Sequence, residues 1–209
     1  LSNQDLDVYI LEKLQLHVNS LNLRNWKRMV RTLISSRNSE VEIAVVGKYI
    51  SLQDSYKSVY EALTHGGIAH NCNVKIRMVE SEDIENSNAE KLLQGVSGVL
   101  VPGGFGDRGI EGKIQAIHYA RMKKKPFLGI CLGMQCAVME FARNVGKFRD
   151  ANSTEFDPET TCPVIDLMEE QKKIYNFGGT MRLGSYACEL KHNTRAREAY
   201  AKKSIMERH

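Results

Sequence analysis

The chain has 209 residues, a hydrophobic fraction of 42% and a formal net charge of +4. This composition is typical of a globular domain with a sizeable core and a short additional segment. The mild positive charge permits an anionic ligand but does not indicate nucleic-acid binding. No apolar run reaches the length of a membrane span and the N-terminus has no signal-peptide pattern, so we expect a cytoplasmic protein without a membrane partner.

The N-terminal part of the chain is predicted to be helical up to about residue 34. Trp26, Val30 and Leu33 belong to an apolar stripe that is set among Arg and Lys residues. Residues 35–39 have the composition of a linker. The next residues, 41–47, form a compact run rich in β-branched side chains, as expected for a strand buried in a parallel sheet.

Strand and helix patterns alternate after residue 47. In chain order we predict a helix at 55–65 closed by Gly66–Gly67, a strand at 74–79, a helix at 89–94, a strand at 98–101, a helix at 111–123 and a strand ending at Gly129. The alternation predicts an α/β fold of three layers, with a mainly parallel central sheet flanked by helices. Beyond residue 151 the pattern is less regular, and residues 178–184 predict a turn that enters a strand, as in a hairpin.

The most informative segment is 126–135, which reads as a buried strand, a Gly-x-Cys-x-Gly turn and the start of a helix. This is the cysteine version of a nucleophile elbow, in which a sharp turn lifts the reactive side chain above the sheet. The helix predicted from Met134 to about Val145 would point its N-terminal amides at Cys131 and favour the thiolate. The alternative is that Cys131 is a buried and inert cysteine.

A glycine-rich segment, 101–109, follows the strand at 98–101. Gly104, Gly106 and Gly109 satisfy the dinucleotide pattern G-x-G-x-x-G, but the next strand does not end in the acidic residue that would bind a ribose. We therefore interpret Gly103–Gly104 as an oxyanion-hole loop whose backbone amide can approach a reacting carbonyl, with the Leu132 amide as second donor. A tight loop without a ligand remains the alternative.

Other titratable groups carry weaker signals. Lys48 follows Gly47 without the upstream glycine of a phosphate-binding loop, and Lys57 and Glu61 are most simply a surface ion pair. None of the six histidines stands in a metal-ligand spacing, and the five cysteines are scattered without C-x-x-C spacing. We expect no metal site and no disulfide framework, and the sequence identifies no base for Cys131.

Six segments, taken in order, closely resemble the class I glutamine amidotransferase domain of the CTP synthase family: 47–49, 54–58, 100–106, 129–135, 151–156 and 178–184. Gly-x-Cys-x-Gly alone would indicate only the amidotransferase superfamily, and the last two segments narrow the resemblance. It covers essentially the whole chain. It implies a helical linker at 1–39 from an absent synthetase domain, and an amidotransferase domain at 40–209 that lacks its C-terminal part.

The resemblance implies a ligase of pyrimidine biosynthesis. This domain would hydrolyse L-glutamine through a cysteine thioester and supply ammonia for the ATP-dependent amination of UTP to CTP. No cofactor is implied in this domain, whereas the full enzyme would use ATP and Mg²⁺, with GTP as activator. The partners implied are the synthetase domain of the same polypeptide and further copies in a homotetramer.

The resemblance also implies residue roles. Cys131 matches the nucleophile, and Gly104 and Leu132 match the oxyanion-hole backbone. The positions that match glutamine-binding residues are Gly104, Leu132, Gly133, Met134, Gln135 and Glu155, with Glu155 at the α-amino group. A response to GTP is implied for Lys57, Glu61 and Phe105.

One departure from the family concerns its catalytic His and Glu, which belong to a His-Pro-Glu segment that does not occur in these residues. His209 is not a substitute for that histidine. We therefore expect residues 1–209 alone to hydrolyse glutamine weakly or not at all. The alternative function is a catalytically silent α/β module that binds a partner or nucleotide through the Gly104 loop.

Overall fold

A four-stranded parallel sheet forms the centre of the protein, as shown by a computed structural model that describes residues 4–17, 22–35, 39–48, 50, 53–167 and 184–208. Its strands are β1 (Ser39–Gly47), β2 (Cys72–Glu80), β3 (Gly98–Val101) and β4 (Phe127–Gly129), in the order β2-β1-β3-β4. All three pairings are parallel. The prediction of a mainly parallel sheet is therefore confirmed.

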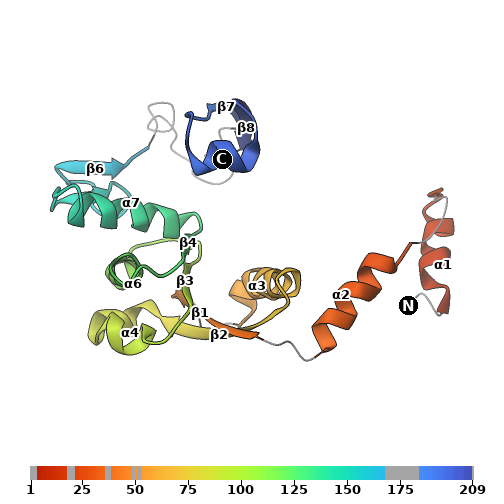
Figure 1. The fold of residues 1–209 in the computed structure, drawn as a ribbon. Helices are drawn as coiled ribbons and strands as arrows, with labels where there is room; N and C mark the ends of the chain where they lie inside the picture. The colour runs from red at the N-terminus through yellow and green to blue at the C-terminus, as the bar shows by residue number, and fades with distance from the viewer. Residues whose placement is uncertain are drawn as a thin grey trace.

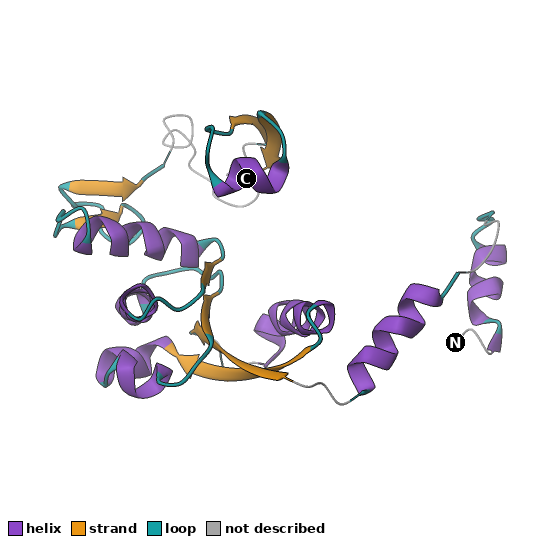
Figure 2. Cartoon of the chain, in the orientation of Figure 1, coloured by secondary structure: helices purple, strands orange, loops and turns teal. Residues whose placement is uncertain are grey.

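Helices cover both faces of this sheet (Figures 1 and 2). They are α3 (Lys57–Ala69), preceded by the 3-10 turn η2 (Gln53–Tyr56), α4 (Ser81–Asn86), α5 (Ala89–Leu93), α6 (Ile110–Met122) and α7 (Leu132–Asn144). In Figure 1, α3 lies on one face, and α6 and α7 lie on the other. The three predicted layers are thus present, since right-handed crossovers between parallel strands place the helices in this way.

The core lies between the sheet and the layer of α4 to α7. The inner strands contribute fully buried residues such as Val46 and Val101, and α6 contributes Ile114 and Ile117. Strands β1 and β3 carry continuous runs of buried apolar residues because both of their faces are covered. The helix that follows β4 adds Leu132, Cys136 and Met139 to the same cluster.

The predicted end of one helix is wrong, and one short helix was not predicted. Helix α3 does not close at Gly66–Gly67 but continues to Ala69, and Asn71 with a φ of 50° makes the turn that follows. Tertiary contacts override the low helix propensity of glycine here, since Gly67 is buried. The short helix α4 was not predicted, because its polar sequence shows no apolar periodicity over so few residues.

The C-terminal part of the described chain is built from short strands. Strand β5 (Ala151–Ser153) pairs in parallel with β6 (Cys162–Ile165), and both contact α7. Strand β7 (Ser185–Glu189) pairs antiparallel with β8 (Ser204–Arg208), and α8 (Arg195–Tyr200) lies between them in the chain. The predicted turn falls at 178–184, of which 178–183 lie outside the described residues, and β7 starts directly after Gly184.

Two N-terminal helices precede the sheet, α1 (Leu6–Lys13) and α2 (Arg24–Ile34), and Figure 1 shows both extending away from it. The apolar stripe of α2 is exposed, with Trp26 62% accessible. Residues 36–38 of the predicted linker lie outside the described residues. Among the helices of the described part of the chain, none is long and apolar enough to cross a membrane.

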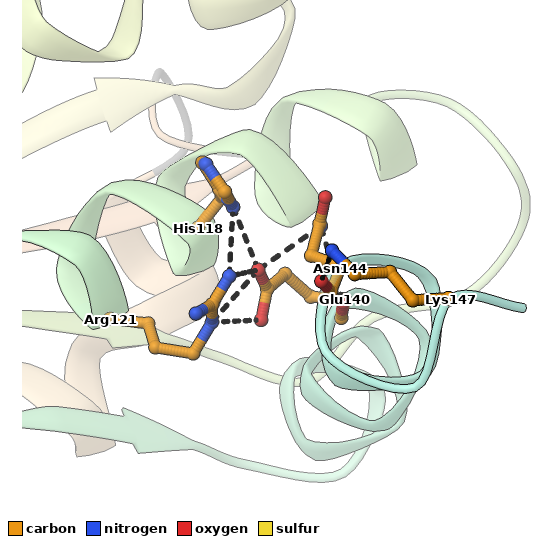
Figure 3. Close-up of polar contacts among 5 residues, drawn as sticks. All are labelled: His118, Arg121, Glu140, Asn144 and Lys147. Atoms are coloured by element: carbon orange, nitrogen blue, oxygen red, sulfur yellow. Dashed lines mark hydrogen bonds and ion pairs between the residues drawn. The ribbon is translucent and has the colours of Figure 1, made fainter. Parts of the chain in front are cut away.

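A buried carboxylate joins α6 to α7 (Figure 3). Glu140 is 1% exposed, and Arg121 donates to both of its oxygens at 2.7 to 3.1 Å. His118 Nδ1 lies 2.8 Å from Glu140 Oε1, and Asn144 Nδ2 donates to the same oxygen at 3.1 Å. Burial alone would raise the pKa of Glu140, but the hydrogen bonds from Arg121 and His118 outweigh it and hold the pKa below its ordinary value.

This cluster predicts a pH-dependent contribution to stability. Glu140→Gln should lower the free energy of unfolding at pH 7 by about 2 kcal/mol, because the amide cannot replace a charged acceptor. A carboxyl with a lowered pKa stabilises the fold above its unfolded pKa of about 4.3, and this stabilisation disappears as the pH falls through the lower folded pKa. Urea unfolding at several pH values measures it. A difference between the two proteins that does not shrink below about pH 4 would contradict the account.

Candidate active site

The candidate site lies at the carboxyl edge of the parallel sheet. Val101 pairs with Gly129 at the ends of β3 and β4, so the segments that leave these strands emerge side by side. Strand β1 ends at the same edge, where Lys48 follows Gly47. In open α/β sheets this edge is where ligands bind, because the strand-to-helix loops gather there.

Cys131 stands on a sharp turn between β4 and α7, as the sequence predicted. It is the N-cap residue of α7 and has φ 53° and ψ −109°, a conformation that a non-glycine residue adopts only when its surroundings enforce it. The Ile130 amide donates to the Val101 carbonyl at 2.9 Å, and the Gly133 amide donates to the Ile130 carbonyl at 3.0 Å. These bonds hold the turn against β3 and present Cys131 as an exposed side chain.

The two flanking glycines are required by close backbone packing. A Cβ atom at Gly133 would lie 2.0 Å from the Val101 carbonyl oxygen, and one at Gly129 would lie 2.5 Å from the Gly133 carbonyl oxygen. Both contacts are with backbone atoms, which cannot rotate away as a side chain can. The glycines therefore let the elbow lie directly on β3, which is the role that the motif predicts.

The glycine-rich loop after β3 faces the elbow. A Cβ atom built on Gly103 would lie 3.4 Å from Cβ of Cys131, and one built on Gly104 would lie 3.5 Å from Cδ2 of Leu132. Leu132 is the first residue of α7, so its amide is one of those that have no acceptor within the helix. The structure thus brings together Cys131, Gly104 and Leu132, the three residues assigned to the nucleophile and the oxyanion hole.

One residue of the site was missed by the sequence reasoning. Lys48 is 6% exposed, and its Nζ donates a hydrogen bond to the carbonyl oxygen of Phe105, in the loop that carries Gly104. Arg108 of the same loop donates to the Lys48 carbonyl at 3.1 Å. The only available signal was the position of Lys48 at the carboxyl end of a predicted central strand, where its contact with residue 105 could not be inferred.

The two cysteines of the elbow region have different environments. Cys136, five residues further along the chain in α7, is fully buried, and burial raises the pKa of its thiol to about 11. Its burial and its raised pKa both disfavour the thiolate, so we expect Cys136 to be an unreactive core residue. Cys131 is exposed at the N-terminus of the helix, so the part of the alternative that placed Cys131 in the core is wrong, and its reactivity stays a prediction.

The remaining glutamine-site candidates are divided between two places. Gly133 is buried in the elbow, whereas Met134 is 49% exposed and Gln135 is half-buried on the first turn of α7. Glu155 is exposed in the loop after β5, and no hydrogen bond joins it to Cys131 or Leu132, all of which the structure describes. Its neighbour Phe156 lines a cavity of about 390 Å³, together with Glu82, Glu85, Asp107, Arg108, Gly109, Ile110, Glu111 and Asn152.

The candidate effector residues lie on the surface. Lys57 and Glu61 are exposed one turn apart on α3, and among the described contacts no ion pair joins them, so the prediction of a surface ion pair is wrong. Phe105 is 82% exposed at the glycine loop. None of the five cysteines, all of which the structure describes, forms a disulfide, and the described residues contain no cluster of His, Cys, Asp or Glu that could hold a metal ion.

The geometry defines a class of protein. An exposed cysteine on a strand-to-helix elbow, opposite a glycine loop, is the arrangement of α/β enzymes that attack a carbonyl with a side-chain nucleophile. The family comparison agrees, since the family described as "Glutamine amidotransferase class-I" matches residues 51–209. The chain belongs to this family.

Curated relatives share this sequence over its whole length. CTP synthase of Clostridium beijerinckii is 56% identical over 209 residues, which are 100% of this chain and 39% of the relative. CTP synthase of Caldanaerobacter subterraneus is 53% identical over 211 residues, with the same two shares. The chain therefore spans about two fifths of the length of these relatives.

A solved structure has the same fold. It is described as the glutaminase domain of the Trypanosoma brucei CTPS with bound acivicin, and it is 38% identical to this chain. The superposition has a TM-score of 0.69 and covers 81% of this chain and 66% of that one. The central parallel sheet with its flanking helices is thus the fold of a class I glutamine amidotransferase.

Proposed function

We propose that this chain is the glutaminase part of a CTP synthase and that Cys131 is its nucleophile. The observation that carries the proposal is the elbow itself. Cys131 is exposed at the first turn of α7. A Cβ atom built on Gly103 would lie 3.4 Å from the Cβ atom of Cys131. The similarity to CTP synthases and to the glutaminase domain of the T. brucei protein supports the substrate, L-glutamine.

The chemistry follows from this geometry. The Cys131 thiolate attacks the side-chain carbonyl carbon of glutamine, and negative charge develops on the carbonyl oxygen. The backbone amides of Gly104 and Leu132 donate to that oxygen, which lowers the energy of the tetrahedral intermediate. The carbon–nitrogen bond then breaks, the nitrogen takes up a proton and leaves as ammonia, and water hydrolyses the thioester to glutamate.

Proton transfer requires a base and an acid in addition to the cysteine. His118, the best-placed histidine for pairing with a carboxylate among the described residues, is bound to Glu140 and Arg121 rather than to Cys131. We propose that the catalytic His and Glu lie outside residues 1–209 of the full-length polypeptide. For the same reason we expect residues 1–209 alone to have little or no turnover.

We further propose the setting of this domain in the whole enzyme. A synthetase domain of the same polypeptide would use ATP and Mg²⁺ to activate UTP and would receive the ammonia, within a cytoplasmic homotetramer. Glu155 would bind the α-amino group of glutamine, because it is an exposed carboxylate whose neighbour Phe156 lines the same cavity as Asp107 and Arg108. Lys57, Glu61 and Phe105 would respond to GTP, since all three are exposed at the surface.

Isotope transfer tests the function. The full-length enzyme is incubated with UTP, ATP, Mg²⁺, GTP and glutamine that carries ¹⁵N only in the amide, in the presence of unlabelled ammonium. We expect ¹⁵N in the exocyclic amine of the product CTP and one glutamate released per ¹⁵N-labelled CTP. Product CTP with unlabelled nitrogen, or no glutamate release, would show that this domain is the alternative, a silent module that binds through the Gly104 loop.

A further inference from the structure

Two buried lysines donate hydrogen bonds to backbone carbonyls of the glycine loop after β3. Lys48, at the end of β1, donates to the Phe105 carbonyl, and Lys113 of α6 donates to the Gly109 carbonyl at 3.3 Å. Both lysines are almost completely buried, at 6% and 1% exposure. The two ammonium groups therefore bind carbonyl oxygens at opposite ends of the segment 105–109.

Of these two lysines, Lys48 lies closer to Gly104. A Cβ atom built on Gly104 would lie 3.9 Å from Cε of Lys48, and a Cβ atom built on Gly106 would lie 3.5 Å from its Nζ. Its backbone is held as well, because Arg108 donates to the Lys48 carbonyl and also pairs with Glu82 at 3.5 Å. The lysine and the loop thus fix one another through a side-chain and a main-chain contact.

A buried lysine costs free energy unless its ammonium group is hydrogen-bonded, so its presence in the core requires a reason. Gly104 and Gly106 have no side chains to restrict the backbone, and Gly106 has a φ of 74°. A loop of such residues needs an external contact to keep one amide aimed at an oxyanion. The bond from Lys48 to the Phe105 carbonyl, one residue after Gly104, supplies that contact.

We infer that Lys48 is a positioning residue for glutamine hydrolysis, which orients the Gly104 amide of the oxyanion hole through the Phe105 carbonyl. The inference rests on the proposed glutaminase function. Lys48 should stabilise the transition state and not bound glutamine, because the oxyanion forms only when Cys131 attacks. Removal of the ammonium group should therefore lower kcat and leave KM for glutamine nearly unchanged.

The test compares wild type, Lys48→Met and Lys48→Arg in the full-length enzyme. Lys48→Met keeps the apolar stem and removes the hydrogen bond, and kcat for glutamine hydrolysis should fall about 10- to 100-fold, less than the loss of an oxyanion donor itself. KM should stay within about threefold of wild type. Lys48→Arg retains a cationic donor and should recover part of the lost kcat.

Alkylation of Cys131 by iodoacetamide distinguishes a positioning role of Lys48 from a general disruption of the site by the substitution. This reaction displaces iodide at a saturated carbon and forms no oxyanion, so its rate should be the same in Lys48→Met and wild type. Three results for Lys48→Met would each overturn the inference. They are an alkylation rate that falls as much as kcat, alkylation of Cys136 by the reagent, and a kcat within about threefold of wild type. Failure of the wild type to hydrolyse glutamine would instead contradict the proposed function.

Discussion

Replacement of Cys131 by alanine should lower glutamine-dependent CTP formation by the full-length enzyme by about 10⁴-fold or more. Alanine cannot form the thioester, and the oxyanion hole alone supplies only a small part of the rate enhancement. Synthesis from added ammonium should stay within about twofold of wild type, because it does not pass through this site. Steady-state rates with each nitrogen source measure both effects.

Cys162→Ala provides the matched control for this experiment. Cys162 is a partly buried free cysteine on β6, outside the elbow segment 126–135, and its replacement should leave both activities unchanged. If Cys131→Ala retains glutamine-dependent synthesis while folded, Cys131 is not the nucleophile. If both nitrogen sources fail in a folded Cys131→Ala protein, the separation of the two reactions that we propose is wrong.

Gly133→Ala should have the largest effect on stability among single methyl additions at the site. The new Cβ would lie 2.0 Å from the Val101 carbonyl oxygen and 2.8 Å from its carbonyl carbon, both backbone atoms of the central strand β3. Helix α7 can make room only by moving away from the sheet. We expect a loss of about 3 kcal/mol in the free energy of unfolding, together with a loss of glutaminase activity.

Gly66→Ala is the control, for which we expect a change of opposite sign in the free energy of unfolding. Gly66 lies inside α3, and a Cβ at this position would meet no atom within 4 Å. Alanine is the better helix former, so the variant should be more stable by about 0.5 to 1 kcal/mol. Urea unfolding of both variants measures the pair. A Gly133→Ala protein as stable as wild type would show that the elbow does not pack on β3 as described.

The elbow could be predicted from the sequence because all of its determinants are local. The strand before Cys131, the two glycines and the start of the helix after it all lie within the segment 126–135, and the alternation of strands and helices gives the parallel sheet that supports them. The interpretation of Gly103–Gly104 as a loop that serves the elbow rested on the close backbone approach that glycine permits, and the structure places Gly103 beside Cys131. The turn at Cys131 and its closeness to the glycine loop are therefore present in the structure, whereas the catalytic and binding roles of these residues stay predictions.

Other features depend on contacts between distant residues. The bond from Lys48 to Phe105 spans 57 positions, and the contacts of Glu140 with Arg121 and His118 span 19 and 22. A lysine after a strand and a glutamate inside a helix have no local pattern that distinguishes them from exposed charges. Helix α3 likewise continues through Gly66–Gly67 because of its packing, which local propensity does not include.

The most direct test of the central claim is covalent labelling of the full-length enzyme by a diazo-ketone analogue of glutamine, followed by peptide mapping. We expect one adduct per chain, on Cys131, whose formation is suppressed by excess glutamine. Cys136 should stay unlabelled, because it is fully buried with a pKa of about 11, and exposed Cys188 should stay unlabelled because it lies outside the elbow. Labelling spread over several cysteines, absent from Cys131 or insensitive to glutamine would contradict the assignment of Cys131 as the glutaminase nucleophile.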